Sequence, residues 1–284
     1  MFNYLRYLRH SSFACKSFPR EVLGRIYRLG INILPFNFTI EQLITQKYKF
    51  KLHVKFVFSN FKEWRNKNYN CFPVYIKLAR TSKCFFDIEA HVGIINLVVA
   101  KNLKKNDVIY AFEPSKVNLK FLKYYIACNK IKNIRIVDKL ISSSEKKKTI
   151  FFEASESSGI NSIVSLNKKN ITYKNFPSSI TLDIFCQHNN VYPDIIKVDI
   201  EGSGIEMLMG AKRILKKYKQ FIFLSCHPYH IQKLGYQKSF FFDVLENLDY
   251  KIFDLNGKKP SVLKNTEYLL IHKKRNLDYV FKDK

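Results

Sequence analysis

The amino-acid sequence predicts an α/β fold, in which a mostly parallel sheet is covered by helices on both faces. From residue 84 onward, short apolar runs alternate with segments of helical periodicity, as expected for strands joined by helical connections. Residues 194–200 are expected to form a strong central strand. With 284 residues, the chain is also long enough to bury a large core without disulfide bonds.

The expected elements follow in order along this region. Strands are expected at residues 84–88, 108–113, 134–137, 148–153, 194–200, 221–224, 250–254 and 267–272, with a polar loop at 155–178. Helices are expected at residues 93–101, 115–129, 205–218 and 240–248. Pro114 ends the strand before the second helix, and Ser115 is expected to cap that helix, because a serine side chain at this position accepts a backbone N–H of the first turn.

The first 80 residues differ from the rest in charge. They hold 15 basic and 3 acidic residues, nearly half of the formal net charge of +26. We therefore expect a basic helical arm with a strand extension at residues 1–80 and an α/β domain at residues 81–284. Helical spacing of apolar residues within 1–34 suits either an arm packed on the domain or a basic amphipathic helix on an anionic membrane. Residues 49–58 alternate between basic and apolar, which predicts a strand with His53 on its exposed face.

Composition limits the partners that the charge suggests. Lysine outnumbers arginine by 39 to 10, as an AT-rich genome would impose on any protein, so we expect no nucleic-acid partner. The six cysteines lack Cys-x-x-Cys spacing and are interpreted as buried free thiols in a reducing compartment. With no apolar run of 18 residues and no signal-peptide core, a cytoplasmic protein is expected, with the arm allowing peripheral membrane contact.

Acidic residues fall at the ends of expected strands, where ligands bind in sheets of this kind. They are Asp87, Glu113, Asp199 and Glu201. A carboxylate there accepts hydrogen bonds from ribose hydroxyls or an amine, or else caps the next helix. The series favours a ligand crevice. The sequence lacks a Gly-x-Gly-x-x-Gly fingerprint, a P-loop and a Gly-x-Ser-x-Gly elbow, which favours a cofactor that needs no pyrophosphate cradle.

Several short blocks resemble those of FkbM-type methyltransferases. Residues 86–93, Phe-Asp-Ile-Glu-Ala-His-Val-Gly, are similar to the family's first S-adenosylmethionine motif, and residues 111–114, Ala-Phe-Glu-Pro, to its second-strand motif. Residues 196–202, Ile-Lys-Val-Asp-Ile-Glu-Gly, resemble a third block. Around this block, the chain also matches the family at Thr181, Asp183, Glu206, Leu208, Gly210 and Ala211. The blocks stand in the family's order over about residues 84–255.

The resemblance implies a class I methyltransferase fold, with a Rossmann-like sheet of seven strands of which the last is antiparallel. It also implies methyl transfer from S-adenosylmethionine to an oxygen nucleophile, such as a hydroxyl of a sugar or another metabolite. Carried over residue by residue, the cofactor loop holds Asp87, Glu89, Ala90, His91 and Gly93. Glu113 would hold the ribose hydroxyls, and Asp199 and Glu201 would face the sulfonium and the incoming hydroxyl, whose proton a carboxylate can take.

Three positions leave alternatives open. Ser142 falls where many relatives have an acidic residue near the adenine amine. His227 follows the strand at 221–224 and is either a base or substrate contact, or an ordinary loop residue. Glu89 stands where the family has glycine, which lets the backbone approach the cofactor. Glu89 either turns into solvent, pairs with the cofactor ammonium, or marks a weakened site.

The sequence therefore predicts an S-adenosylmethionine-dependent O-methyltransferase with a small-molecule or glycan acceptor. A pseudo-methyltransferase that binds partners through its basic surface is the alternative, and an RNA methyltransferase is a third interpretation. The latter lacks support, because the chain has no Asn/Asp-Pro-Pro-Tyr/Phe block. No metal site is predicted, although Asp199 and Glu201 leave a magnesium ion open.

Overall fold

The computed structural model describes residues 38–56, 61, 72–153, 173–199, 204–276 and 280. The chain divides into two compact units, Met1–Phe72 and Pro73–Lys284. The division into a basic arm at 1–80 and a domain at 81–284 stays a prediction. The segment 1–34, which carries the membrane interpretation of the arm, lies outside the described residues.

The described part of the first unit contains a β-hairpin. Strand β1 (Thr39–Ile44) pairs antiparallel with β2 (Tyr48–His53). In β2, Phe50 and Leu52 are buried, whereas Lys49 and Lys51 are exposed, as the alternating pattern predicts. The hairpin thus has one face packed and one face solvated.

The prediction that His53 faces solvent is wrong. Its side chain is buried, and its Nδ1 accepts the backbone N–H of Lys55 at 3.0 Å. The strand ends at His53 and passes into the 3₁₀ helix η1 (Val54–Phe56), so the alternation of a strand no longer applies at this point.

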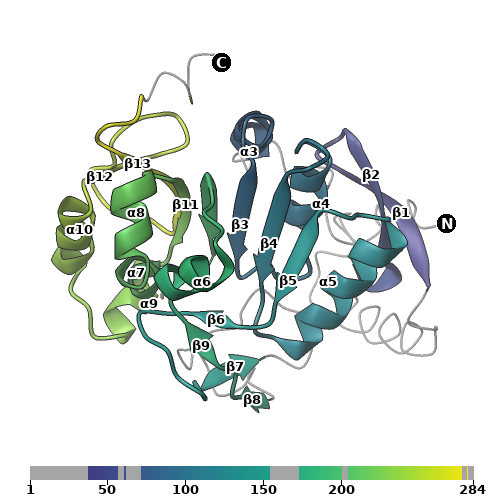
Figure 1. The fold of residues 1–284 in the computed structure, drawn as a ribbon, viewed down its shortest axis with the longest axis horizontal. Helices are drawn as coiled ribbons and strands as arrows, with labels where there is room; N and C mark the ends of the chain where they lie inside the picture. The colour runs from purple at the N-terminus through teal and green to yellow at the C-terminus, as the bar shows by residue number, and fades with distance from the viewer. Residues whose placement is uncertain are drawn as a thin grey trace, which may run out of the picture. The chain divides into compact units, whose positions relative to one another are not determined.

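The second unit is built on a seven-stranded sheet (Figure 1). In spatial order, its strands are β12 (Tyr250–Phe253), β13 (Thr266–His272), β11 (Phe221–Cys226), β10 (Ile195–Val198), β3 (Cys84–Ile88), β4 (Val108–Phe112) and β5 (Ile134–Val137). Neighbours run parallel except at β13, which is antiparallel to both β11 and β12. This confirms the predicted sheet, in which the last strand of the chain is the antiparallel one.

Helices lie along the sheet and connect its strands (Figure 1). They are α3 (Phe72–Ala79), α4 (Ile94–Ala100), α5 (Lys116–Cys128), α6 (Leu182–Asn189), α7 (Gly204–Met209), α8 (Lys212–Tyr218), α9 (Pro228–Lys233) and α10 (Lys238–Asn247). Helix α5 lies towards the β5 end of the sheet, whereas α8 and α10 lie towards the β12 end. The predicted cap of α5 is confirmed, because Ser115 Oγ accepts the N–H of Asn118 at 3.3 Å.

Two small strand pairs lie outside the main sheet. Strand β6 (Leu140–Ile141) pairs with β9 (Ser179–Ile180), and β7 (Phe151–Glu153) pairs with β8 (Tyr173–Asn175). The additional strand predicted at 148–153 is therefore present as β7 but begins later. Strand β8 falls within the predicted polar loop, most of which lies outside the described residues.

The single helix predicted at 205–218 is two helices, α7 and α8. The break occurs because Asp183 acts as a cap from outside the helix. Its two carboxylate oxygens accept the N–H groups of Arg213 and Ile214, each at 2.9 Å, which starts α8 anew. The N–H of Asp183 donates to the carbonyl of Gly210 at 3.0 Å, so the break is bonded from both sides.

Aromatic side chains fill the core between the sheet and α6. Phe86, Phe112 and Phe185 form a triangle of edge-to-face contacts, with ring centroids 4.8–5.8 Å apart. All three are buried. Such contacts between β3, β4 and α6 fix the spacing of the strands whose carboxyl ends carry the site.

Four cysteines are described, and all are free thiols as predicted, although Cys128 is half-buried rather than buried. Cys84, Cys186 and Cys226 are buried, and burial raises the pKa of the Cys226 thiol to about 12. Such thiols are unreactive packing groups.

No helix among the described residues is both long enough and apolar enough to cross a membrane.

Gly210 is expected to tolerate no side chain. A Cβ at this position would lie 2.2 Å from the backbone carbonyl oxygen of Ser142, which cannot rotate away. Gly210→Ala should lower the free energy of unfolding by about 1–3 kcal/mol in urea titration. Gly204→Ala is the control, because the Cβ there meets only the tip of the Leu224 side chain. Equal losses in the two variants would contradict this prediction.

Candidate functional site

A buried lysine joins the carboxyl ends of the two central strands. Lys197 of β10 is paired in register with Asp87 of β3, and its Nζ lies 2.9 Å from Asp87 Oδ1 and 3.7 Å from Asp199 Oδ2. The same ammonium donates to the backbone carbonyl of Glu89 at 3.1 Å. Lys197 is 4% exposed and Asp87 is 0% exposed. One cation therefore holds both strand ends and the loop that follows β3.

Burial and charge oppose each other in this cluster. Burial raises the pKa of Asp87 to about 6, against the lowering effect of Lys197. Burial acts to lower the pKa of Lys197, but the carboxylates of Asp87 and Asp199 outweigh it and hold that pKa above its usual range. The ammonium is therefore charged at neutral pH.

Asp199 is the solvent-facing member, with 40% of its side chain exposed. Desolvation acts to raise its pKa, but the Lys197 ammonium and the neighbouring side chains of His227 and Ser225 hold that pKa well below its usual range. Asp199 is thus an anion at neutral pH, at the carboxyl end of the central strand.

The loop between β3 and α4 has an uncommon backbone. Glu89, His91 and Gly93 have φ angles of 55°, 54° and 84°, all in the left-handed region. Gly93 favours glycine because its φ of 84° is one that side-chain-bearing residues rarely adopt, and a Cβ there would also lie 2.3 Å from Leu122 Cδ1. Glu89, where the resemblance leads one to expect glycine, adopts this conformation at a cost of about 1–2 kcal/mol. The backbone has therefore kept a glycine-like shape without the glycine.

Glu113 lies directly after β4 and is 2% exposed. Its Oε1 accepts the N–H of Ser115 at 2.9 Å and Asn118 Nδ2 at 3.3 Å, and its Oε2 accepts the N–H of His91 at 2.7 Å. Burial raises its pKa to about 7, although these hydrogen bonds oppose the shift. Glu113 thus ties the loop after β3, through His91, to the start of α5.

His227 follows β11 and approaches Asp199 across the strand ends. Its Nε2 lies 3.9 Å from Asp199 Oδ1, and its ring stacks on that of His230 at 5.6 Å between centroids. Burial, His227 and Lys233 lower the pKa of His230. The carboxyl ends of β10 and β11 therefore present an anion and an imidazole side by side.

The predicted site residues thus fall into two linked groups. Lys197 links Asp87, the Glu89 backbone and Asp199, and Asp199 is in turn beside His227. Ala90 and His91 form the second group with Glu113, because Ala90 N–H donates to the carbonyl of Phe112 at 2.9 Å.

Ser142 is not part of either group. It follows β6, outside the main sheet, where its N–H donates to Ile180 O at 3.2 Å and its carbonyl packs against Gly210. Its neighbour Ser143 donates to Glu206 Oε2, and Tyr236 donates to Glu206 Oε1. Glu201 lies outside the described residues. Among the described residues, no three His, Cys, Asp or Glu side chains gather as a metal site.

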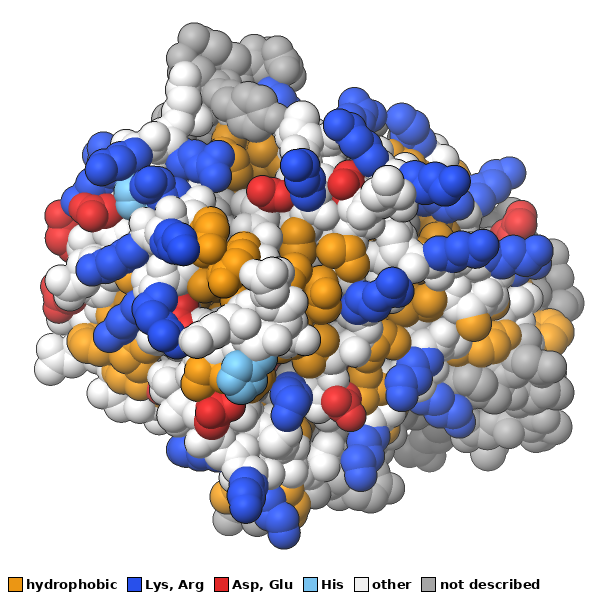
Figure 2. Space-filling model, viewed as in Figure 1, with side chains coloured by type: hydrophobic (Ala, Val, Ile, Leu, Met, Phe, Trp, Pro, Cys, Tyr) orange, Lys and Arg blue, Asp and Glu red, His pale blue; other side chains and the backbone are white. Residues whose placement is uncertain are grey.

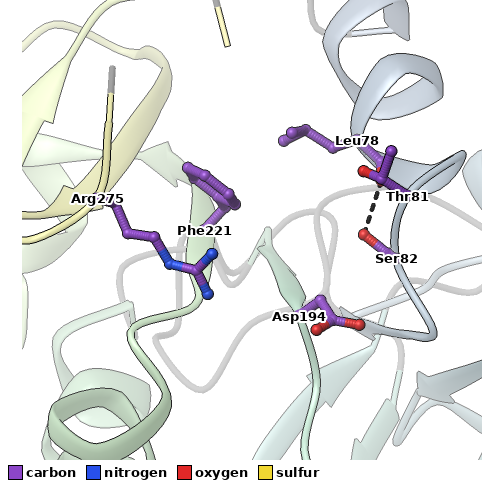
Figure 3. A pocket seen from close by; sticks show the side chains of 6 residues that line it. All are labelled: Leu78, Thr81, Ser82, Asp194, Phe221 and Arg275. Carbon is purple, nitrogen blue, oxygen red and sulfur yellow. Dashed lines mark hydrogen bonds between the residues drawn. The ribbon is translucent and has the colours of Figure 1, made fainter. Parts of the chain in front are cut away.

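A hollow of about 170 Å³ lies at the opposite end of the strands, near the amino ends of β10 and β11 (Figure 3). Thr81, Ser82, Asp194 and Arg275 line it, together with Leu78 and Phe221. Its polar groups already serve the fold: both hydroxyls donate to Leu78 O, and Asp194 Oδ2 accepts the N–H groups of Lys83 and Cys84. Because Asp194 and Phe221 stand at the amino ends of β10 and β11, this hollow is separate from the candidate site.

The model of the Methyltransferase FkbM domain matches residues 87–252, which is more than half of the chain. The chain belongs to the FkbM methyltransferase family. The match covers nearly all of the region in which the short blocks were noticed. S-adenosylmethionine is the cofactor of this family, so the family match supports it as the cofactor of this chain.

Solved structures are similar at low identity. Methyltransferase FkbM from Methylobacillus flagellatus KT is 19% identical, with a TM-score of 0.42, over 67% of this chain and 44% of that chain. A SAM-dependent methyltransferase from Agrobacterium tumefaciens is 10% identical, with a TM-score of 0.43, over 84% of this chain and 70% of that one. The chain therefore spans less than half the length of the FkbM structure. No curated protein matches it.

The residues present fit this cofactor on two counts. A carboxylate accepts about four hydrogen bonds, and described residues supply three to Glu113, so Oε2 has one acceptor position that these donors do not fill, as a ribose hydroxyl would need. The positive φ angle of Glu89 is also one that glycine would adopt freely. Glu89 therefore keeps a backbone conformation that the family's glycine could adopt.

Two residues were not predicted to belong to the site. Lys197 stands within the third block but has no predicted role, and Asn118, which donates to Glu113, is not among the predicted residues. The signal for Lys197 was present, because a lysine between the apolar residues of a central parallel strand requires a buried partner. No signal in one sequence singles out Asn118, since the turn after Pro114 decides its contact.

Glu89→Gly should stabilise the protein. The substitution removes the left-handed strain of about 1–2 kcal/mol and adds about 0.5–1 kcal/mol of backbone entropy cost, so the free energy of unfolding should rise by about 0.5–1 kcal/mol. Glu89→Ala is the matched control, because it also removes the carboxylate but keeps the Cβ. If the alanine variant gains as much as the glycine variant, strain is not the cause.

Glu113 should make stability fall as pH rises. Its pKa is about 7 in the folded chain against an ordinary value of 4.5, so its contribution is fully present below pH 4.5 and is lost as pH rises through about 7. The loss should be on the order of 1–3 kcal/mol in urea titrations across this range. Glu113→Gln should flatten the dependence of stability on pH. What remains should be the contribution of Asp87, which has the same sign but is smaller, because the pKa of Asp87 is raised only to about 6. An unchanged slope in Glu113→Gln would refute the assignment.

Proposed function

We propose that this protein is an O-methyltransferase that transfers the methyl group of S-adenosylmethionine to a hydroxyl of a sugar or another small metabolite. The observation that carries the proposal is the pairing of Asp199 with His227 at the adjoining ends of β10 and β11. A hydroxyl is a weak nucleophile that must lose its proton as it attacks, so an acceptor of this kind needs a base.

When bound, S-adenosylmethionine supplies an electrophilic methyl group on a positively charged sulfur. His227 takes the hydroxyl proton of the acceptor as the new oxygen–carbon bond forms. Asp199 holds the imidazole ring in place and stabilises the imidazolium that results, because Lys197 keeps Asp199 ionised. Methyl transfer is an in-line displacement, so holding the acceptor oxygen opposite the leaving sulfur contributes much of the rate.

The loop after β3 and the end of β4 are proposed to hold the cofactor. Glu113 accepts a ribose hydroxyl, and the backbone of Ala90, His91 and Gly93 borders the methionine part. Asp87 acts through Lys197, since it is fully buried. Ser142 borders the adenine. Glu201 stays a proposed neighbour of the reacting groups on the strength of the family block alone.

The free thiols of Cys84, Cys128, Cys186 and Cys226 support a reducing compartment, and we place the protein in the cytoplasm. The alternative of a pseudo-methyltransferase is favoured by the glutamate at position 89 alone. The glycine-like backbone of that loop supports an active enzyme instead.

Removal of the His227 side chain should remove the proposed general base while leaving the cofactor site intact. His227→Ala should lower kcat by about 10²–10⁴-fold, with S-adenosylmethionine binding unchanged in calorimetry. Added imidazole should restore part of the rate, because it replaces the missing group. His188→Ala, which removes an exposed histidine of α6, is the control and should keep full activity.

Activity is measured with methyl-labelled S-adenosylmethionine on a panel of sugars, glycosides and hydroxylated small molecules, with total RNA alongside. Label in a base-stable ether of a small acceptor supports the proposal. Label in RNA would replace it with an RNA methyltransferase. Absence of S-adenosylmethionine and S-adenosylhomocysteine binding in calorimetry would establish the pseudo-methyltransferase, and gain of binding by Glu89→Gly would identify the residue responsible.

A further inference from the structure

A concentrated basic surface lies at the amino ends of the parallel strands, opposite the end that carries Asp199 and His227. It consists of Lys216, Lys217, Lys219, Lys273, Lys274 and Arg275, and we call it the basic edge. The first three lie at the end of α8 and just beyond it, and the others follow β13. In Figure 2, Lys and Arg side chains gather at the upper left, over the part of the molecule where Figure 1 draws α8 and the ends of β12 and β13.

Contacts bring these two segments together. Arg275 donates from Nε to the carbonyl of Lys219 at 3.0 Å and from Nη2 to that of Tyr218 at 3.3 Å. Asp249 lies within electrostatic range of both Lys216 and Lys273. The basic edge is therefore one continuous surface rather than a set of scattered lysines.

Little negative charge offsets this surface. Lys273 Nζ lies 2.7 Å from Glu246 Oε1 and 3.2 Å from Asp249 Oδ1, so one lysine takes both nearby carboxylates. Lys216, Lys217 and Lys274 are exposed, and no described carboxylate lies within ion-pair distance of them. The surface therefore keeps a positive field that attracts a partner of opposite charge.

The basic edge has no side chain available to read or stack the bases of a nucleic acid. Its one guanidinium, on Arg275, is held by two backbone carbonyls and lies 5.2 Å over the Phe221 ring, so it is not available for bidentate contacts. Tyr218 offers no free face for stacking a base, because it packs on Tyr192 at 4.2 Å and Lys217 Nζ lies 5.1 Å from its ring centre.

We propose that the basic edge docks the protein onto an anionic phospholipid surface. Clustered lysines are point charges that attract anionic headgroups without fixed geometry. The apolar residues of α8, Ile214 and Leu215, are buried in the core, so the contact is electrostatic and inserts no side chain. Docking at the amino ends of the parallel strands leaves Asp199 and His227, at the carboxyl ends, clear of the membrane.

The test uses the full chain and vesicles of phosphatidylcholine with about one-third phosphatidylserine, with pure phosphatidylcholine vesicles as reference. Co-sedimentation should occur with the anionic vesicles and decline steeply as salt is raised. The combined variant Lys216→Gln, Lys217→Gln and Lys274→Gln should bind on the order of 100-fold more weakly, since each lysine near the surface strengthens binding about fivefold.

The matched control is Lys116→Gln, Lys123→Gln and Lys130→Gln, which removes the same charge from exposed lysines on and after α5. It should keep most of the affinity. The proposal is overturned if the first variant binds vesicles as the unchanged protein does, if both variants weaken binding equally, or if the first variant loses binding to labelled single-stranded RNA while keeping vesicle binding. Thermal unfolding of both variants checks that they are folded.

Discussion

The candidate site depends on one buried ammonium. Lys197 reaches the carboxylates of Asp87 and Asp199 and the carbonyl of Glu89, so a single charge aligns two strands and a loop. Taking this cation out of water is unfavourable unless anions surround it, and the two carboxylates meet that need. Replacing it with an apolar residue would leave Asp87 as an uncompensated buried charge, which makes the cluster a unit in which no member can be changed alone.

The fold was predictable because its signals are local and repeated. Each strand of the main sheet is a short apolar run, and the α5 helix carries its own cap at Ser115. The antiparallel last strand followed from the resemblance, since no local pattern distinguishes β13 from its parallel neighbours. Where the prediction failed, a distant group had intervened: Asp183 splits the helix at 205–218 from some thirty residues upstream.

The site was predictable in part for a related reason. The positions of Asp87, Glu113 and Asp199 at strand ends follow from the topology, so sequence order was enough to find them. The charge and hydrogen-bond partners of these carboxylates did not follow from the topology. Whether a carboxylate faces a cation, as Asp87 faces Lys197, or receives three N–H donors, as Glu113 does, depends on which backbone segments meet at the strand ends. The burial of His53 was missed in the same way, because a 3₁₀ turn follows it.

The two hydrogen bonds that Asp183 accepts from the start of α8 have a consequence for how relatives are interpreted. Asp183, Gly210 and the Thr181 hydroxyl, which caps α6, serve the architecture and touch no reacting group in the described structure. A descendant that lost its chemistry would still need them in order to fold. Matching this block therefore traces common ancestry, whereas catalytic competence has to be judged from the separate set around Lys197, Glu113 and His227.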